Sequence, residues 1–114
     1  MGSVFNDWPE EDLAKIKSLG NEVAFDAQQK IFSEGDEADF LYFLQSGKVS
    51  LYIDKFNTRD EIRLVEAGDW FGEMAMFNGN RRNASALTLE PTVFLAVARS
   101  DFTRLMDSEP AMRG

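Results

Sequence analysis

The sequence of 114 residues contains no cysteine and no histidine. Without cysteine there are no disulfides and no thiolate chemistry, and without histidine there is no imidazole general base. The usual zinc ligands are missing together with these two residue types. A catalytic site would therefore depend on carboxylates combined with Ser, Thr, Lys or Tyr. The absence of cysteine also fits an intracellular setting, and we predict a cytoplasmic location.

Positive charge and long apolar runs are scarce as well. The chain has 12 basic and 20 acidic residues, which gives a net charge of −8. Because phosphate neutralisation dominates nucleic-acid affinity, we expect no nucleic-acid partner on this chain. No apolar run approaches the roughly 18 residues needed to cross a bilayer, and no secretory signal is visible. We predict no membrane span, and a position on the intracellular face if the parent is a membrane protein.

What is present is sufficient for one folded domain. Hydrophobic residues make up 44% of the chain, and they include ten phenylalanines and two tryptophans. This composition argues against disorder, and the length is close to the common size of a single domain.

Two segments predict helices, residues 9–19 and residues 100–110. In each of them, apolar residues recur three or four positions apart and so share one face. Gly20 is a natural stop for the first helix, and Ser100 or Asp101 can cap the second. The apolar faces would consist of Leu13 and Ile16 in the first helix, and of Phe102, Leu105 and Met106 in the second.

Between these helices, short apolar runs separated by turn signals predict antiparallel strands. Ile62 and Leu64 alternate with charged neighbours, as expected of a half-buried strand, and residues 92–98 are apolar on both faces, which predicts a central strand. A further strand is expected over residues 83–90, and turns at residues 34–36, 46–48 and 67–69. The strand over residues 48–54 would bury Val49, Leu51 and Ile53, and expose Lys48, Ser50, Tyr52 and Asp54.

The stretch FGEMAMFNGNRRNASA, residues 71–86, carries the chemistry. Gly72 allows a close backbone approach, and a short helix is expected from Glu73 until Gly79. The free N–H groups of its first turn favour an anion, and a nearby arginine offers a planar fork that matches phosphate oxygens. Glu73 would repel a phosphate unless a hydroxyl group donates to it. The pattern therefore predicts a ligand with both a phosphate and a hydroxyl.

Each of these features also has a structural alternative. Glu73 could cap its own helix, and the pair Arg81 and Arg82 could be a solvated loop. The aromatic run at residues 40–44 is expected in the core rather than in base stacking, because no basic face accompanies it. We expect Glu34 and Asp36 to belong to a turn rather than to a metal site. Trp70 is expected either in the core or on a surface that binds a partner. Met74, Met76 and Phe77 are expected to pack the short helix onto the strands.

The same stretch resembles the phosphate-binding cassette of cyclic-nucleotide-binding domains. These domains occur in kinase regulatory subunits, cyclic-nucleotide-gated channels and catabolite-activator-type regulators. The cassette pattern is matched by Phe71-Gly72-Glu73, by Met74-Ala75-Met76-Phe77 and by Arg82-Asn83-Ala84, and the similarity extends over about residues 10–110. The resemblance implies a mainly β fold with flanking helices: an antiparallel β-roll (double-stranded β-helix or jelly-roll) with a short inserted phosphate-binding helix.

The resemblance also implies domain limits. The cyclic-nucleotide-binding domain would span residues 9–110, preceded by a tail or cloning remnant at residues 1–8. Residues 111–114 would begin the following helix.

The resemblance implies roles for individual residues. Glu73 would accept a hydrogen bond from the ribose 2′-hydroxyl, and Arg82 would pair with the cyclic phosphate. Asn83 departs from the usual Ala, Ser or Thr, and leaves the choice between cAMP, which we favour, and cGMP open. The phosphate site would be completed by backbone N–H groups near Gly72, Met74, Ala75, Asn83 and Ala84. Phe71, Arg81 and Ser85 are secondary candidates, and Arg81 is expected as a loop charge rather than a direct ligand contact.

The expected function is a regulatory module that binds cyclic nucleotide and relays its occupancy to an effector domain in the same or a partner chain. The family also allows a homodimer. We expect no enzyme, no catalytic cofactor and no metal, because cleavage of a phosphodiester usually needs metal-activated water held by His or Asp clusters. The alternative is a degenerate β-roll that binds no nucleotide and serves as a platform for protein interaction or dimerisation.

Overall fold

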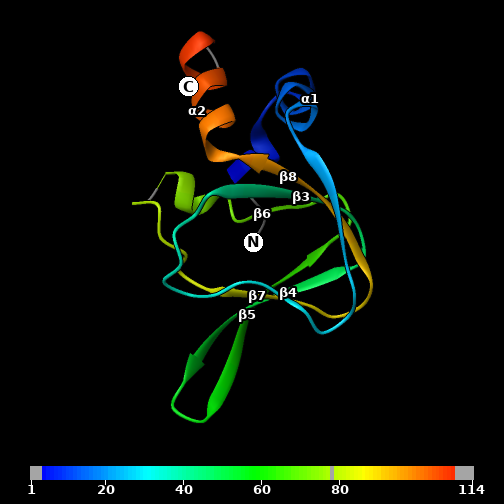
Figure 1. The fold of residues 1–114 in the computed structure, drawn as a ribbon, viewed down its shortest axis with the longest axis vertical. Helices are drawn as coiled ribbons and strands as arrows, with labels where there is room; N and C mark the ends of the chain where they lie inside the picture. Colours follow the sequence, from blue (N-terminus) through cyan, green and yellow to red (C-terminus); the bar gives the residue numbers. More distant parts are fainter. Residues whose placement is uncertain (1–3, 78, 110–114) are drawn as a thin grey trace.

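The computed structural model describes residues 4–77 and 79–109. Its strands form two four-stranded antiparallel sheets, with the orders β1-β8-β3-β6 and β2-β7-β4-β5. Figure 1 shows the sheets facing each other, with α1 and α2 beyond the first sheet. The strands are β1 Asn21–Phe25, β2 Lys30–Phe32, β3 Phe40–Ser46, β4 Lys48–Lys55, β5 Thr58–Glu66, β6 Trp70–Phe71, β7 Ser85–Thr88 and β8 Thr92–Ala98.

Both predicted helices are present. Helix α1 spans Glu10–Ser18 and buries Leu13 and Ile16, and α2 spans Arg99–Ser108 and buries Phe102 and Met106. The predicted cap of α2 at Ser100 or Asp101 is wrong. The helix begins at Arg99, directly after β8, and Ala98 occupies the N-cap position without a side-chain cap hydrogen bond.

The N-terminal segment packs onto the domain rather than trailing from it. Val4–Asp7 form a 3₁₀ turn, η1, and Phe5 is fully buried. The Phe5 ring meets Trp8 at 4.7 Å and Trp70 at 5.0 Å between centroids, both edge-on, a favourable arrangement for aromatic pairs. Residues 1–3 of the predicted tail and the predicted helix start at residues 111–114 lie outside the described residues.

Two apolar clusters hold these layers together. A helix-side cluster joins the helices to the outer face of the first sheet: Phe5, Leu13, Ile16, Leu41, Trp70, Val97, Phe102 and Met106. An interior cluster fills the space between the sheets: Tyr42, Leu44, Val49, Val65, Phe71, Ala86, Phe94 and Ala96. The aromatic run 40–44 therefore contributes to the core as predicted, and Trp70 belongs to the core. Strand β8 is central, as its two apolar faces predicted.

Strand β4 differs from its predicted alternation. The pairing register with β5 shifts between Leu51 and Tyr52, because a β-bulge interrupts the ladder. The extra residue is Ile62 of β5, which has no partner, whereas the pairing of β4 with β7 is regular. Within β4, Ser50 and Tyr52 are buried, and Leu51 and Ile53 are only half-buried.

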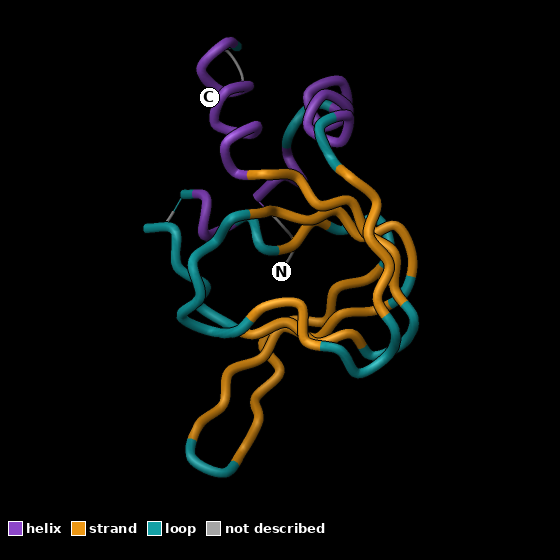
Figure 2. Tube along the Cα trace, viewed as in Figure 1, coloured by secondary structure: helices purple, strands orange, loops and turns teal. Residues whose placement is uncertain are grey.

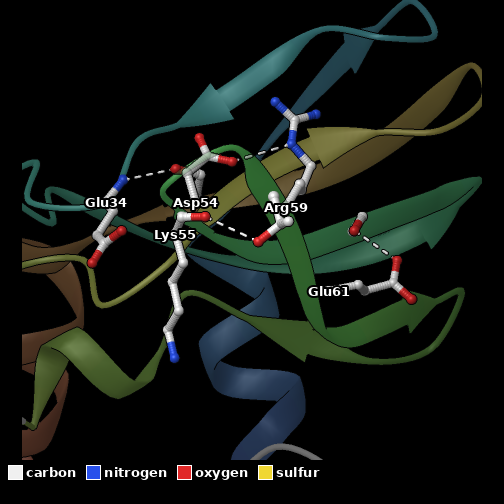
Figure 3. A network of polar contacts seen from close by, with 8 residues as sticks. Glu34, Asp54, Lys55, Arg59 and Glu61 are labelled. Carbon is white, nitrogen blue, oxygen red and sulfur yellow. Dashed lines mark hydrogen bonds and ion pairs between the residues drawn. The ribbon is translucent and has the colours of Figure 1, made fainter.

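Strand β5 also contradicts the prediction of a buried apolar face. It is the edge strand of its sheet, and the exposed fraction is 53% for Ile62 and 40% for Leu64. The β4–β5 hairpin projects away from the rest of the fold, as the tube view makes clear (Figure 2). Its polar side chains bond to one another: Arg59 Nε lies 3.4 Å from Asp54 Oδ1, and the Ser50 hydroxyl donates to Glu61 over 2.6 Å (Figure 3).

Across residues 4–77 and 79–109, no helix is both long and apolar enough to cross a membrane.

Candidate functional site

The cassette begins where β6 ends. Gly72 has φ of +75°, and Met74–Met76 then form a 3₁₀ turn, η2. The predicted helix is therefore a single turn. Its hydrogen bonds run from Met76 N to Glu73 O and from Phe77 N to Met74 O, at 2.9 and 3.0 Å.

The backbone of Arg82 is held by the turn after β2. Gly35 N donates to Arg82 O over 2.8 Å, and Arg82 N donates to Asp36 O over 2.9 Å. These two bonds join segments more than forty positions apart in the sequence. The predicted turn at residues 34–36 thus has a role that the sequence did not reveal, since it fixes the position of Arg82.

The side chain of Arg82 points inward, with an exposed fraction of only 5%. Its Nη1 donates to Gly72 O over 2.6 Å and its Nη2 donates to Phe40 O over 2.5 Å. Its Nε is buried and has no hydrogen-bond partner. A buried donor without a partner is costly, so this atom is the natural place for an acceptor that a ligand would bring.

Two aromatic rings accompany the guanidinium. Arg82 Cζ lies 4.0 Å from the centroid of the Phe32 ring and 5.6 Å from that of Tyr42. Burial lowers the pKa of Arg82, and the charged form stays dominant because the ordinary value for arginine is so high. Burial also raises the pKa of the Tyr42 phenol, with the nearby Arg82 charge opposing the shift.

Gly72 provides the space for this arrangement. A Cβ atom there would lie 2.7 Å from Arg82 Nη1 and 3.1 Å from Tyr42 Cδ2. The positive φ is a second reason for glycine at this position. The close backbone approach predicted for Gly72 is therefore an approach to Arg82.

A cavity of about 50 Å³ lies against the cassette. All seven primary candidates from the sequence line it, namely Gly72, Glu73, Met74, Ala75, Arg82, Asn83 and Ala84. The structure thus brings the predicted carboxylate and the predicted arginine into one space. Their roles toward a ligand stay predictions.

Glu73 is almost completely buried, with 1% of its surface exposed. It occupies the N-cap position of η2 but makes no side-chain cap hydrogen bond there. The capping alternative for Glu73 is therefore wrong. The solvated-loop alternative is wrong for Arg82 too, since Arg82 is buried.

The secondary candidates lie elsewhere. Phe71 is part of the interior cluster, and the Ser85 hydroxyl accepts a hydrogen bond from Glu34 N over 2.9 Å. Arg81 is exposed: its Nη1 donates to Gly35 O over 3.3 Å, and its Nη2 lies 3.8 Å from Glu37 Oε1. In this structure Arg81 behaves as a loop charge.

Two further predictions concern the packing of Met74, Met76 and Phe77, and the turn at Glu34 and Asp36. Met76 packs against the helix-side cluster, and the half-exposed Phe77 ring meets two members of that cluster edge-on, Phe102 at 6.0 Å and Phe5 at 6.3 Å. Met74 is exposed and does not pack there, so the prediction is wrong for this residue. Within the described part of the chain, no group of three or more acidic residues could hold a metal ion. Glu34 and Asp36 belong to the turn described above.

Sequence reasoning missed three residues that line the cavity: Phe32, Leu51 and Arg63. Arg63 comes from β5, and its Nη2 donates to Trp70 O over 2.9 Å. The alternation of β5 carried the signal for Arg63. If the charged face of β5 is the inner one, the alternation predicts that Arg63 faces the cassette.

The two facing antiparallel sheets, with a buried glutamate and a buried arginine lining one cavity, define the chain as a β-roll domain. A family model described as the cyclic nucleotide-binding domain matches residues 22–109, so the chain belongs to this family. This confirms the resemblance inferred from the cassette. It also confirms the predicted fold class, since the structural relatives share the β-roll.

Several proteins of known sequence and structure are similar. The chain is 29% identical to the cGMP-dependent protein kinase egl-4 of Caenorhabditis briggsae over 97% of its length, and 36% identical to the cyclic AMP receptor protein of Thermus thermophilus over 70%. It covers 15% and 38% of these two proteins, respectively.

Among solved structures, the Thermus thermophilus catabolite activator protein matches with a TM-score of 0.81 and 29% identity, over 96% of this chain and 52% of that one. The regulatory domain of Toxoplasma gondii PKA with cAMP matches with a TM-score of 0.78 and 26% identity, over 88% of this chain and 38% of that one. The chain therefore corresponds to the regulatory domain found within such longer proteins.

Proposed function

We propose that the chain binds a cyclic nucleotide, cAMP in preference to cGMP, and relays occupancy to an effector domain in the same or a partner chain. The observation that carries this proposal is the partnerless, buried Nε of Arg82 in the same cavity lining as the buried Glu73. A cyclic phosphate brings the acceptor for the arginine, and a ribose hydroxyl brings the donor for the carboxylate. One ligand then offers a suitable group to each of the two side chains.

Binding requires the cavity to widen. Ligand pockets usually measure roughly 300–1,000 Å³, whereas the cavity here measures about 50 Å³. Met74 lines one side of the cavity and is 40% exposed, so its side chain has room to move outward when a ligand enters. A change of shape that depends on the ligand is also what a relay needs, because a ligand shifts an equilibrium only by binding one state better than the other.

The decisive experiment is calorimetric titration with cAMP and cGMP, with linear 5′-AMP as the control. We expect binding of a cyclic nucleotide and much weaker binding of 5′-AMP. No binding of either cyclic nucleotide at millimolar concentration would refute the proposal and favour the degenerate β-roll as an interaction or dimerisation platform.

The role of Glu73 has its own test. Glu73→Gln should weaken cAMP binding, because a neutral amide is a poorer acceptor for the ribose hydroxyl than a carboxylate. The 2′-deoxy analogue of cAMP should bind the native protein weakly and should lose little further affinity in the variant. Equal binding of cAMP and its 2′-deoxy analogue to the native protein would show that Glu73 does not read the ribose.

One observation favours cGMP as a second candidate ligand. Arg63 lines the cavity, and an arginine fork matches the O6 and N7 acceptors of guanine. Against this, position 83 is Asn rather than the Thr associated with better cGMP binding in the family. Arg63→Gln decides between the two: a loss of cGMP affinity with unchanged cAMP affinity would assign guanine recognition to Arg63.

The proposal includes a regulatory rather than a catalytic role, a cytoplasmic location and no binding of nucleic acid by this domain. A homodimer is compatible with it. Incubation with cAMP or cGMP, followed by chromatography of the nucleotides, tests the first of these points. We expect the nucleotide to be recovered unchanged.

A further inference from the structure

The segment Phe32–Asp36 holds Arg82 at three points. Gly35 and Asp36 make the two backbone hydrogen bonds described above, and the Phe32 ring lies 4.0 Å below the guanidinium carbon. Phe32 ends the short strand β2, just before the turn that carries those bonds. One segment therefore fixes both the backbone and the side chain of the arginine.

Phe32 is itself supported by other rings. Its ring stacks with Tyr42 at 5.9 Å and 17°, and with Phe71 at 6.3 Å and 29°, and the Tyr42 and Phe71 rings stack at 4.9 Å and 22°. These contacts come from three strands, β2, β3 and β6. The Phe32 ring thus belongs to a group of mutually stacked rings, and the guanidinium lies over it.

A cation over a ring face is attracted by the quadrupole of the ring, and more strongly where water is excluded. Here the guanidinium is buried and its hydrogen bonds go to two carbonyl oxygens, Gly72 O and Phe40 O. The carbonyls fix the two terminal nitrogens in the guanidinium plane, and the ring supports that plane from one side. Together they leave Nε as the donor that is still unused.

We propose that Phe32 is a positioning residue for Arg82: its ring face holds the guanidinium in place through cation–π attraction, so that the arginine is preorganised for the phosphate of the ligand. The proposal deepens the proposed function and rests on it. Preorganisation raises affinity by removing the entropy that a mobile side chain would lose on binding.

The first test is made without ligand. A proton above a ring face is shielded, so the Arg82 side-chain signals should be shifted upfield in the NMR spectrum of the ligand-free protein. The shift should disappear in Phe32→Leu and persist in Phe32→Tyr, which keeps the ring. An Arg82 signal at the ordinary position in the native protein would overturn the proposal.

The second test measures affinity for cAMP and cGMP. Phe32→Leu keeps an apolar side chain but removes the π face, and should weaken binding roughly tenfold, whereas Phe32→Tyr should bind nearly as the native protein does. The matched control is Phe43→Leu, because Phe43 also lies under a cation, Lys17 Nζ at 4.0 Å, but packs against the helix-side cluster. Equal losses of cyclic-nucleotide affinity in Phe32→Leu and Phe43→Leu would show that Phe32 contributes only through packing, and would overturn the proposal.

Fluorinated phenylalanines at position 32 separate the two roles most sharply. Successive fluorines weaken and then reverse the quadrupole while the ring keeps nearly the same shape. A stepwise loss of affinity with fluorine number supports the proposal, and constant affinity overturns it. If neither nucleotide binds even the native protein, the proposed function fails, and the ligand-free NMR shift alone decides whether Phe32 positions Arg82.

Discussion

The cassette and the β4–β5 hairpin place their residues in opposite ways. At the cassette, charged side chains lie inside: Glu73 and Arg82 are 1% and 5% exposed. At the hairpin, apolar side chains lie outside, and Phe56 at the tip is fully exposed at 105%. Both patterns run against the usual distribution of these residue types, in which Glu and Arg side chains are seldom fully buried and large apolar groups are seldom fully exposed.

The two regions differ in what fixes them. Arg82 is held by groups from distant segments, including Gly35, Phe40 and Gly72. The outer part of the hairpin depends on contacts between neighbours in the sequence, such as Asp54 with Arg59 and Thr58 with Lys55 O. Long-range packing belongs to the stable part of a fold, and exposed local pairing to its low-stability end. The comparison therefore teaches that the buried charge lies where long-range contacts fix the fold, whereas the exposed apolar groups lie where contacts are local.

The largest effect is expected from Arg82→Lys. An ammonium group cannot donate to Gly72 O, Phe40 O and a phosphate with the same planar geometry. Loss of charge-assisted hydrogen bonds costs about 1.5–3 kcal/mol, which corresponds to roughly a tenfold to hundredfold weaker cyclic-nucleotide affinity. Isothermal calorimetry measures this change. Unaltered affinity would mean that the buried charge at the cassette does not serve the ligand.

Gly72→Ala should follow, through stability. Its new Cβ would lie 2.7 Å from Arg82 Nη1, in a backbone conformation that disfavours alanine. We expect a loss of about 2 kcal/mol in the free energy of unfolding, measured by urea denaturation. Gly68→Ala is the matched control, because Gly68 has φ of +95° but no atom within 4 Å of its Cβ position. Equal losses in both variants would show strain alone, without a steric conflict with Arg82.

A gain in stability is expected at the tip of the hairpin. Phe56 has φ of +55°, a conformation that is unfavourable for a bulky side chain and easy for glycine. Phe56→Gly should therefore raise the free energy of unfolding slightly, by up to about 1 kcal/mol, as measured by thermal and urea denaturation. A clear loss of stability would show that the exposed ring has a partner within the fold, and would weaken the contrast between the two regions.

The smallest effect is expected from Arg81→Gln. Arg81 is exposed and its ion pair with Glu37 is long, at 3.8 Å. Surface ion pairs contribute roughly 0–1 kcal/mol, so both affinity and stability should change little. Parallel titrations of Arg81→Gln and Arg82→Lys test the register of the cassette. If Arg81→Gln lost as much affinity as Arg82→Lys, the assignment of the phosphate ligand to Arg82 would be wrong.

The cassette could be predicted from sequence because its signals are local: a glycine, a carboxylate, a turn and an arginine at fixed spacing. The buried faces of β4 and β5 could not be predicted, because alternation does not say which side of a strand is buried, and no local pattern marks the extra residue Ile62 in β5. Phe32 and Tyr42 reach Arg82 from segments 50 and 40 positions away. No local pattern contains such a contact, and the burial of Phe5 escaped prediction for the same reason.

The direct junction between β8 and α2 has a mechanical consequence. No loop residue separates Ala98 from Arg99, and Arg99 N is tied to Asp39 O over 2.8 Å, one residue before β3. The direction of α2 is thus set by the sheet and cannot drift independently of it. Phe102 of α2 packs with Phe5 in the helix-side cluster, and this cluster also contains Trp70 of β6, the strand that leads into the cassette.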